Sequence, residues 1–172
     1  KKIDFSKYNL TNMEESLLSI IHNWDFLMDK ESIAASIYSV TKENIIKEIV
    51  SINYGNLSYE INKWENIGGV SHVRRFLSPL INEQIGKPDT FLLDGNMSWE
   101  DLYTNSFKSA IRFLKNKFGD NINDWKWGNL HKTNHQHPLA SEFKEYVDIL
   151  NPKKVSASGD GDTPLAGSFD KN

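Results

Sequence analysis

Residues 98–119 read SWEDLYTNSFKSAIRFLKNKFG and carry the clearest secondary-structure signal in the chain. Ser98 is a preferred N-cap residue with Asp101 three positions later, and Gly119 stands where a glycine commonly follows the last turn of a helix. The apolar residues between these ends recur at helical spacing and form one face, which consists of Leu102, Phe107, Ile111, Phe113 and Leu114. The sequence therefore predicts a helix over about 98–118.

An earlier stretch of the sequence also has apolar residues at helical spacing. Thr11 and Glu14 have the spacing of a capping box, in which two side chains and two backbone N–H groups satisfy one another at a helix start. A broad apolar face follows between Leu17 and Leu27. This pattern predicts a helix over about 12–28.

Two further helices are predicted between these. The charged residues 29–32 break the first pattern, and a second helical period then runs over 33–49. A third apolar-periodic stretch covers 70–81, after the glycine pair at 68–69. Pro79 lies inside this third stretch, and proline removes a backbone donor, so we expect a kinked or broken helix there.

The last third of the chain has a different composition and a weaker helical pattern. A short helical stretch is expected over 140–150, and small residues then dominate 155–169, with a turn at 159–161. The predicted organisation is a helical segment over residues 1–154 and a strand-turn-strand tail over 155–172. The predicted fold class is mainly α, with four to six helices that end in short strands.

Composition excludes several kinds of protein. Of the 172 residues, 38% are hydrophobic and 25% charged, which is ordinary for a globular domain and too apolar for a disordered chain. The 20 basic residues are scattered among 23 acidic ones and the net charge is −3, so nothing predicts a nucleic-acid partner. No apolar run reaches the roughly 20 residues of a membrane span. The absence of cysteine excludes a thiolate nucleophile or ligand.

The densest motif holds three histidines within seven residues, His131, His135 and His137. Imidazole is a common zinc ligand, but this spacing matches neither the helical HExxH pair nor a zinc finger, and His137 precedes a proline that favours extended backbone. We therefore predict no metal and no cofactor here. The remaining interpretations are histidines that hydrogen-bond within a packed loop and histidines that line a pocket.

A second motif, 158–163, reads Ser-Gly-Asp-Gly-Asp-Thr. Asp160 and Asp162 are spaced like the start of a calcium loop, which needs oxygen ligands at alternating positions. Leu165 and Ala166 stand where further ligands would be required. A tight turn is the better interpretation, because aspartate and glycine supply the backbone conformations that turns use.

The large aromatic residues have two possible roles. Large aromatics at helical spacing usually pack in a core, and this is the prediction for Trp24. Trp125 and Trp127 lie outside the predicted helices and are the candidates for lining a pocket, with packing as the alternative. A serine-histidine-aspartate triad is not predicted, because the chain has no G-x-S-x-G element to orient a nucleophile.

Three segments, taken in order, resemble the penicillin acylase family of N-terminal-nucleophile hydrolases. The first is 18–38, which contains Trp-Asp-Phe-Leu-Met at 24–28 where the family usually has glycine in place of Phe26. The second is 127–139, with Trp-Gly-Asn-Leu-His followed by His-Pro-Leu, and the third is Gly-Asp-Gly-Asp-Thr at 159–163. The motif-matching residues of unknown role are Trp127, Gly128, His131, His137, Asp160 and Asp162.

The resemblance implies a periplasmic or extracellular amidase that is made as one precursor and cuts itself into a small alpha and a large beta subunit. Its nucleophile would be the serine exposed at the cut, activated by its own α-amine. It also implies that the terminal strands join an αββα sheet, and that the partners are the alpha subunit and the rest of the beta subunit. The substrate of the parent would be a small amide, such as a penicillin or an acyl-homoserine lactone.

The chain departs from the family in the part that performs catalysis. Residue 1 is Lys1, and the nearest serine, Ser6, is internal. We therefore expect an internal fragment of the beta subunit that contains no catalytic residue, is inactive by itself and has a structural role. The alternative is a stand-alone helical module that binds a ligand or a protein.

Overall fold

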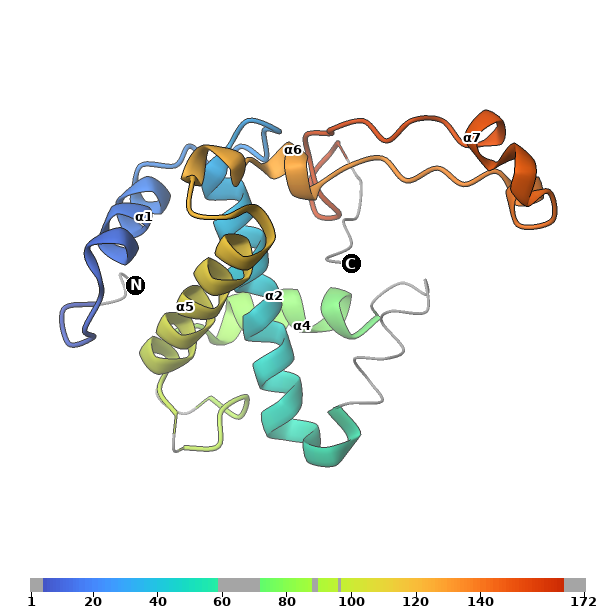
Figure 1. Ribbon diagram of the computed structural model, residues 1–172. Helices are drawn as coiled ribbons and strands as arrows, with labels where there is room; N and C mark the ends of the chain where they lie inside the picture. Colours follow the sequence, from blue (N-terminus) through green and yellow to red (C-terminus); the bar gives the residue numbers. More distant parts are fainter. Residues whose placement is uncertain (1–4, 59–71, 88–89, 96, 166–172) are drawn as a thin grey trace. The chain divides into compact units, whose positions relative to one another are not determined.

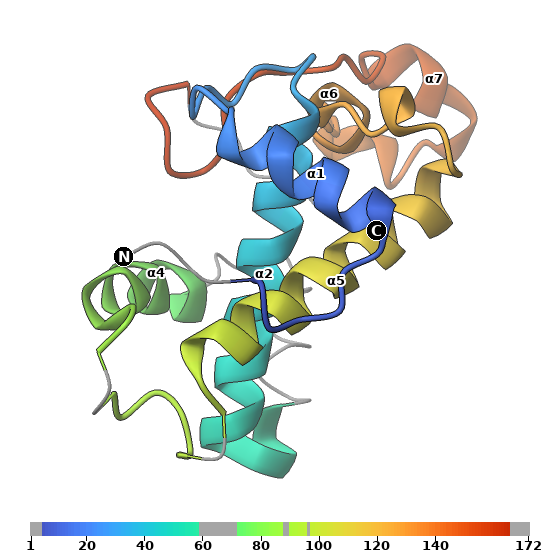
Figure 2. The same ribbon diagram turned by 90° about the vertical axis from the view of Figure 1, so that its left-hand side faces the viewer.

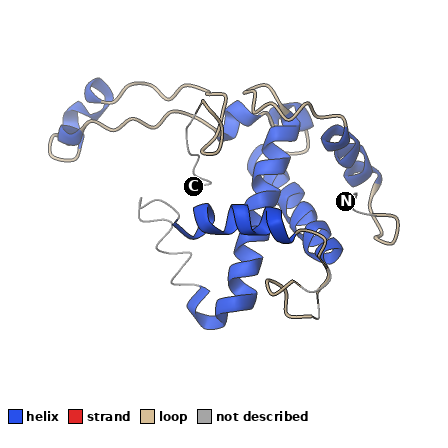
Figure 3. Ribbon diagram, turned by 180° about the vertical axis from the view of Figure 1, so that it is seen from behind, coloured by secondary structure: helices blue, strands red, loops and turns tan. Residues whose placement is uncertain are grey.

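A computed structural model describes residues 5–58, 72–87, 90–95 and 97–165. Helices dominate these residues, as Figure 3 shows, which confirms the prediction of a mainly α fold. The chain divides into two compact units: unit 1 comprises residues 1–16 and 37–113, and unit 2 comprises 17–36 and 114–172. None of the helices in the described ranges is long and apolar enough to cross a membrane.

The first helix, α1, runs over Asn12–His22 and begins as predicted. The N–H of Thr11 donates to Glu14 Oε2 at 2.8 Å, and the N–H of Glu14 donates to Thr11 Oγ1 at 3.3 Å, which completes a capping box. The prediction that the helix continues to residue 28 is wrong. It ends at His22, and the loop that follows contains Phe26 with φ 64, in the left-handed region that a right-handed helix excludes.

The second predicted helix is confirmed as α2, which runs over Ile33–Tyr54 and is followed by the 3-10 turn η1 at Gly55–Leu57. Ser32 begins it, since its Oγ accepts the N–H of Ala35 at 3.1 Å.

The third predicted helix is α4, over His72–Gln84. The expected break at Pro79 does not occur: α4 continues through this residue, whose side chain is exposed. The predicted start at 70–71 lies outside the described residues.

The fourth predicted helix is confirmed as α5, which runs over Trp99–Phe118. Ser98 Oγ accepts the N–H of Asp101 at 3.1 Å and donates to Asp101 Oδ2 at 2.6 Å. At the other end Gly119 has φ 83 and its N–H donates to Lys115 O at 2.8 Å, so the glycine ends the helix as predicted.

The core of unit 1 lies where α2, α4 and α5 pack together, and α4 crosses α2 in Figures 1 and 3. Figure 2 shows α2 and α5 crossing, and Asn44 Nδ2 on α2 donates to Ser106 O on α5 at 3.2 Å. The ring of Phe5 lies 6.4 Å from that of Phe107, with the two planes tilted by 53°, and this contact attaches the N-terminal segment to α5. The buried core residues are Ile45, Ile46, Ile49, Val50, Leu77, Ile81, Leu92, Trp99 and Leu102.

Unit 2 contains short elements after α5. These are η2 at Ile122–Asp124, α6 at Trp127–Leu130, η3 at Pro138–Ala140, η4 at Lys144–Tyr146 and α7 at Val147–Leu150. The stretch predicted as helical over 140–150 is therefore a pair of 3-10 turns followed by α7, at the far end of a long loop in Figure 1.

The expected terminal strands do not form among the described residues of the tail. An isolated antiparallel bridge joins Lys132 to Ser156 instead. One bridge is too short to count as a strand, because a strand needs a neighbour along several consecutive residues. Residues 166–172 lie outside the described ranges, so the division into 1–154 and 155–172 stays a prediction.

The cap of α5 predicts an acid-sensitive contribution to stability. Hydrogen bonds from the Ser98 hydroxyl, the Tyr8 hydroxyl and the Ser98 backbone N–H lower the pKa of Asp101 from 3.8 to about 2. Because the pKa is lower in the folded state, the stabilisation is full above about pH 4 and is lost as the pH falls towards 2. Urea unfolding between pH 2 and 6 should show that Asp101→Asn is less stable than the parent at pH 6, with a gap that narrows at pH 2.

Ser98→Ala should change the pH dependence in the same direction, since it removes the strongest donor to that carboxylate. A slope for Asp101→Asn equal to that of the parent would contradict this account.

Candidate functional site

The three family-like segments converge in unit 2. We call this place the junction and define it by residues 28–32, 127–131 and 156–160. Trp127 is its centre: the side chain is fully buried, and the indole N–H donates to the carbonyl of Gly159 at 2.8 Å. The ring of His131 stacks on this indole with centroids 4.9 Å apart and planes inclined by 13°. The junction thus brings the second and third motifs together around two rings.

His131 hydrogen-bonds within a packed loop, which is one of the two interpretations that the sequence left open. It is only 4% exposed, and its Nδ1 lies 2.8 Å from the carbonyl oxygen of Ala157. A carbonyl can only accept, so Nδ1 must carry the proton. The backbone pairs in the same place, because the N–H of Ala157 donates to His131 O at 2.9 Å. His131 therefore holds the tail segment through both its ring and its backbone.

The first motif joins through backbone hydrogen bonds. The N–H of Trp127 donates to Ser32 O at 2.9 Å, and the N–H of Gly128 donates to Lys30 O at 2.7 Å. These donors open α6 and have no partner within it, so the loop carbonyls satisfy them. The N–H of Gly159 donates to Met28 O at 2.7 Å, which connects the first motif to the third as well.

An exposed ion pair lies beside these bonds. Lys126 Nζ is 2.7 Å from Glu31 Oε2, and this carboxylate raises the pKa of Lys126. Both side chains are largely exposed, at 43% and 62%, so the pair contributes little to stability.

Gly128 is the tightest position in the junction. A Cβ there would lie 2.9 Å from both Lys30 Cβ and Ser156 Cβ and 3.0 Å from Lys30 O. Ser156 also donates its hydroxyl to Gly128 O at 2.7 Å, so the tail cannot move away without losing that bond. Glycine is therefore required here for close approach of three backbone segments.

We predict that Gly128→Ala lowers the free energy of unfolding by about 1–3 kcal/mol, because backbone must shift to admit the methyl group. Gly161→Ala is the matched control in the same unit, since a Cβ at Gly161 meets nothing within 4 Å. It should change stability by less than about 0.5 kcal/mol. Urea unfolding of the two variants makes the comparison, and equal effects would contradict the steric argument.

The other two histidines of the cluster do not join His131. His135 and His137 are exposed. His137 instead caps η3, because its Nδ1 accepts the N–H of Leu139 at 3.2 Å. Among the residues that the structure describes, no group of three or more His, Cys, Asp or Glu side chains has an arrangement that could hold a metal ion.

Protein purified without a histidine tag should carry no stoichiometric zinc. The physical reason is that a zinc site needs three or four ligands directed at one point, whereas His131 and His137 bind different parts of the backbone. Elemental analysis by mass spectrometry makes the measurement. About one zinc per chain would contradict the prediction.

Asp160 and Asp162 form the turn that the sequence predicts. Asp160 Oδ1 accepts the N–H of Asp162 at 2.9 Å, and Thr163 Oγ1 accepts the N–H of Asp160 at 2.9 Å. Gly159 has φ 85, and a Cβ there would collide with the carbonyl oxygen of Leu165. The motif therefore turns the chain immediately after the carbonyl that Trp127 binds.

For Trp125 and Trp127 the structure supports packing, the second of the two roles considered from sequence. Trp125 is fully buried, with its indole N–H donating to Gly119 O at 2.9 Å, so it and Trp127 pack in the interior and do not line a pocket. The core position predicted for Trp24 is wrong, because this ring is only half-buried and lies against the exposed Phe26. Trp64 lies outside the described residues.

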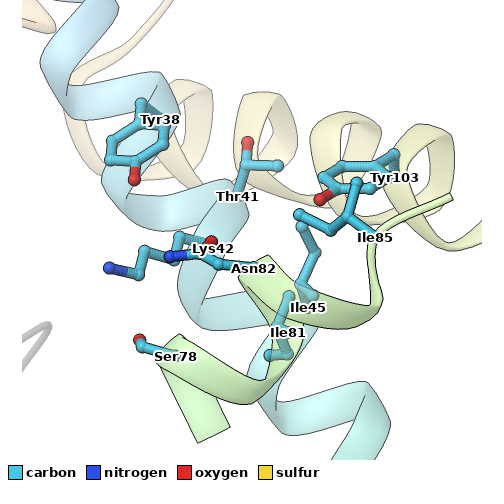
Figure 4. Close-up of a pocket in the computed structure, with 9 residues that line it drawn as sticks. All are labelled: Tyr38, Thr41, Lys42, Ile45, Ser78, Ile81, Asn82, Ile85 and Tyr103. Atoms are coloured by element: carbon cyan, nitrogen blue, oxygen red, sulfur yellow. The ribbon is translucent and has the colours of Figure 1, made fainter. Parts of the chain in front are cut away.

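Sequence reasoning missed a cavity of about 150 Å³ in unit 1. Its walls are α2 and α4, with one residue from α5, as Figure 4 shows. The signal was present, because the lining residues recur at i, i+3, i+4 and i+7 in both segments. They are Tyr38, Thr41, Lys42 and Ile45 on α2, Ser78, Ile81 and Asn82 on α4, Ile85 directly after α4, and Tyr103 on α5.

The segments that meet at the junction lie within a longer match to a known protein family. The family model described as penicillin amidase matches residues 3–172. The chain belongs to the penicillin amidase family.

Among curated proteins, the chain is similar to the penicillin acylase 2 proenzyme of Pseudomonas sp. (strain SE83). The two are 25% identical over 162 residues, a match that covers 88% of this chain and 18% of the relative. The chain therefore spans less than a fifth of the length of that protein.

Proposed function

We propose that the chain is a segment of the catalytic beta subunit of an amide hydrolase of the penicillin acylase type. Family membership supports the amidase class, and the word proenzyme in the relative's name supports a precursor that is processed. The parent would hydrolyse the amide of a penicillin, an acyl-homoserine lactone or a similar N-acyl compound through an N-terminal serine. Its partners would be the alpha subunit and the remainder of the beta subunit.

Within this parent, the proposed role of the segment is structural. The observation that carries the proposal is the junction itself, where the residues that match the family bind one another. Trp127 and His131 direct their rings to the backbone carbonyls of Gly159 and Ala157, and both rings are buried. Groups used in this way connect segments of the chain and are not directed at a substrate.

The serines of the junction support the same interpretation. An activated serine needs a base within hydrogen-bond reach of its hydroxyl. Ser156 Oγ donates to Gly128 O at 2.7 Å. Ser158 Oγ accepts the N–H of Lys30 at 3.0 Å and donates to the Asp29 carboxylate only at 3.5 Å, the outer limit of a hydrogen bond. The nucleophile is therefore expected from another part of the parent.

The test is hydrolysis of a chromogenic phenylacetyl amide. The full-length protein should hydrolyse it, and the purified 172-residue chain, shown by circular dichroism to be helical, should not exceed a buffer blank. Hydrolysis by the 172-residue chain that a serine-directed reagent abolishes would refute the structural role.

A variant of the full-length protein separates scaffold from catalysis. Gly128→Ala should reduce the yield of folded enzyme. The values of kcat and KM per titrated active site should stay within about twofold of the parent, a change of less than about 0.5 kcal/mol in transition-state stabilisation. A loss of about tenfold or more in kcat per active site would place the junction in the catalytic machinery. Gly161→Ala is again the control.

A further inference from the structure

The cavity of unit 1 has no role in the proposed function. Its apolar part is formed by Ile45, Ile81 and Ile85, which come from both walls. A volume of about 150 Å³ is enough for one aromatic ring, since an engineered apolar cavity of about that size binds benzene. The cavity is therefore large enough for a small molecule whose body is a single ring.

Two hydroxyls in the cavity wall lack partners. Thr41 Oγ1 and Ser78 Oγ are buried and form no hydrogen bond with any residue that the structure describes. A buried hydroxyl without a partner costs free energy, and most such groups in folded proteins are satisfied by protein, water or a ligand. Figure 4 shows the two side chains at opposite ends of the cavity. One small polar group cannot reach both, so a single ligand that satisfied them would carry polar groups at two ends.

The charges around the cavity favour an anion at one of these ends. Lys42 is the charged residue among the nine that line it, and its side chain lies on the same side as Ser78 in Figure 4. Its ammonium is 6.0 Å from the centroid of the Tyr38 ring, which places the cation at the cavity wall.

Tyr103 adds a neutral donor. Burial, with a smaller effect from Tyr38, raises the pKa of Tyr103 to about 12, so its hydroxyl stays protonated at neutral pH.

We propose that this cavity binds a small hydroxylated aromatic monocarboxylate. Its ring would pack against Ile45, Ile81 and Ile85. Its carboxylate would accept a hydrogen bond from Ser78 beside the Lys42 ammonium, and its hydroxyl would pair with Thr41 at the other end. This inference does not rest on the amidase assignment, because it concerns binding and involves no reaction.

The experiment measures binding by isothermal titration calorimetry on the full-length protein, with three probes. These are 4-hydroxybenzoate, benzoate, which lacks the hydroxyl, and phenol, which lacks the carboxylate. We expect 4-hydroxybenzoate to bind most tightly, because only this probe can pair with both hydroxyls.

Two variants that remove a hydroxyl with little change in side-chain shape test which end of the ligand each residue binds. Thr41→Val should weaken 4-hydroxybenzoate about tenfold and leave benzoate unchanged, since one hydrogen bond is lost. Ser78→Ala should weaken 4-hydroxybenzoate and benzoate about tenfold and leave phenol unchanged. Neither variant should lower the Tm, because the deleted hydroxyls have no partner among the described residues.

Thr104→Val is the matched control. Thr104 Oγ1 is also buried without a partner among the described residues, but Thr104 does not line the cavity. Its removal should leave all three affinities unchanged.

A crystal structure with 4-hydroxybenzoate completes the test. Density for the probe between Thr41 and Ser78 is the expected result. The proposal is overturned if none of the probes binds, if Thr41→Val and Ser78→Ala behave like Thr104→Val, or if the cavity holds only water or a side chain from elsewhere in the protein.

Discussion

The hydrogen bond from the buried indole N–H of Trp127 to the carbonyl of Gly159 is the contact on which unit 2 depends. It joins positions 32 residues apart in a region where the described chain has little regular structure to hold it. A fully buried indole cannot leave its N–H unpaired without a cost of about 1–3 kcal/mol. The tail must therefore return to Trp127, and the turn at Gly159 gives the backbone the direction that this return requires.

Close approach between backbone segments determines the geometry of the rest of the junction. The N–H groups of Trp127 and Gly128 reach the carbonyls of the loop before α2, and a side chain at Gly128 would prevent that approach. The same three segments carry the family resemblance, which links sequence to structure directly. Their residues lie where three segments of backbone meet, and they pack there against one another. This close approach is the physical basis for the proposed structural role of the junction.

Phe26 stands in an unusual backbone conformation. It has φ 64, in the region that glycine adopts without steric cost, and the sequence resemblance implies a glycine at this position in the family. In this chain the position carries a large side chain that is 78% exposed and lies against Trp24. Asp25 Oδ1 accepts the N–H of Leu27 at 3.0 Å, and this hydrogen bond stabilises the same loop.

By itself, the sequence determined the helices whose signals are local. The caps at Thr11 and Ser98 and the glycine at Gly119 act within four residues of themselves, so α2, α5 and the start of α1 follow from the pattern. Tertiary structure decided everything that depends on distant partners. It buried Trp127 and His131 against carbonyls of the tail. It also placed Thr41 opposite Ser78 across a cavity, because a helical period states which residues share a face but not which face of another helix they meet.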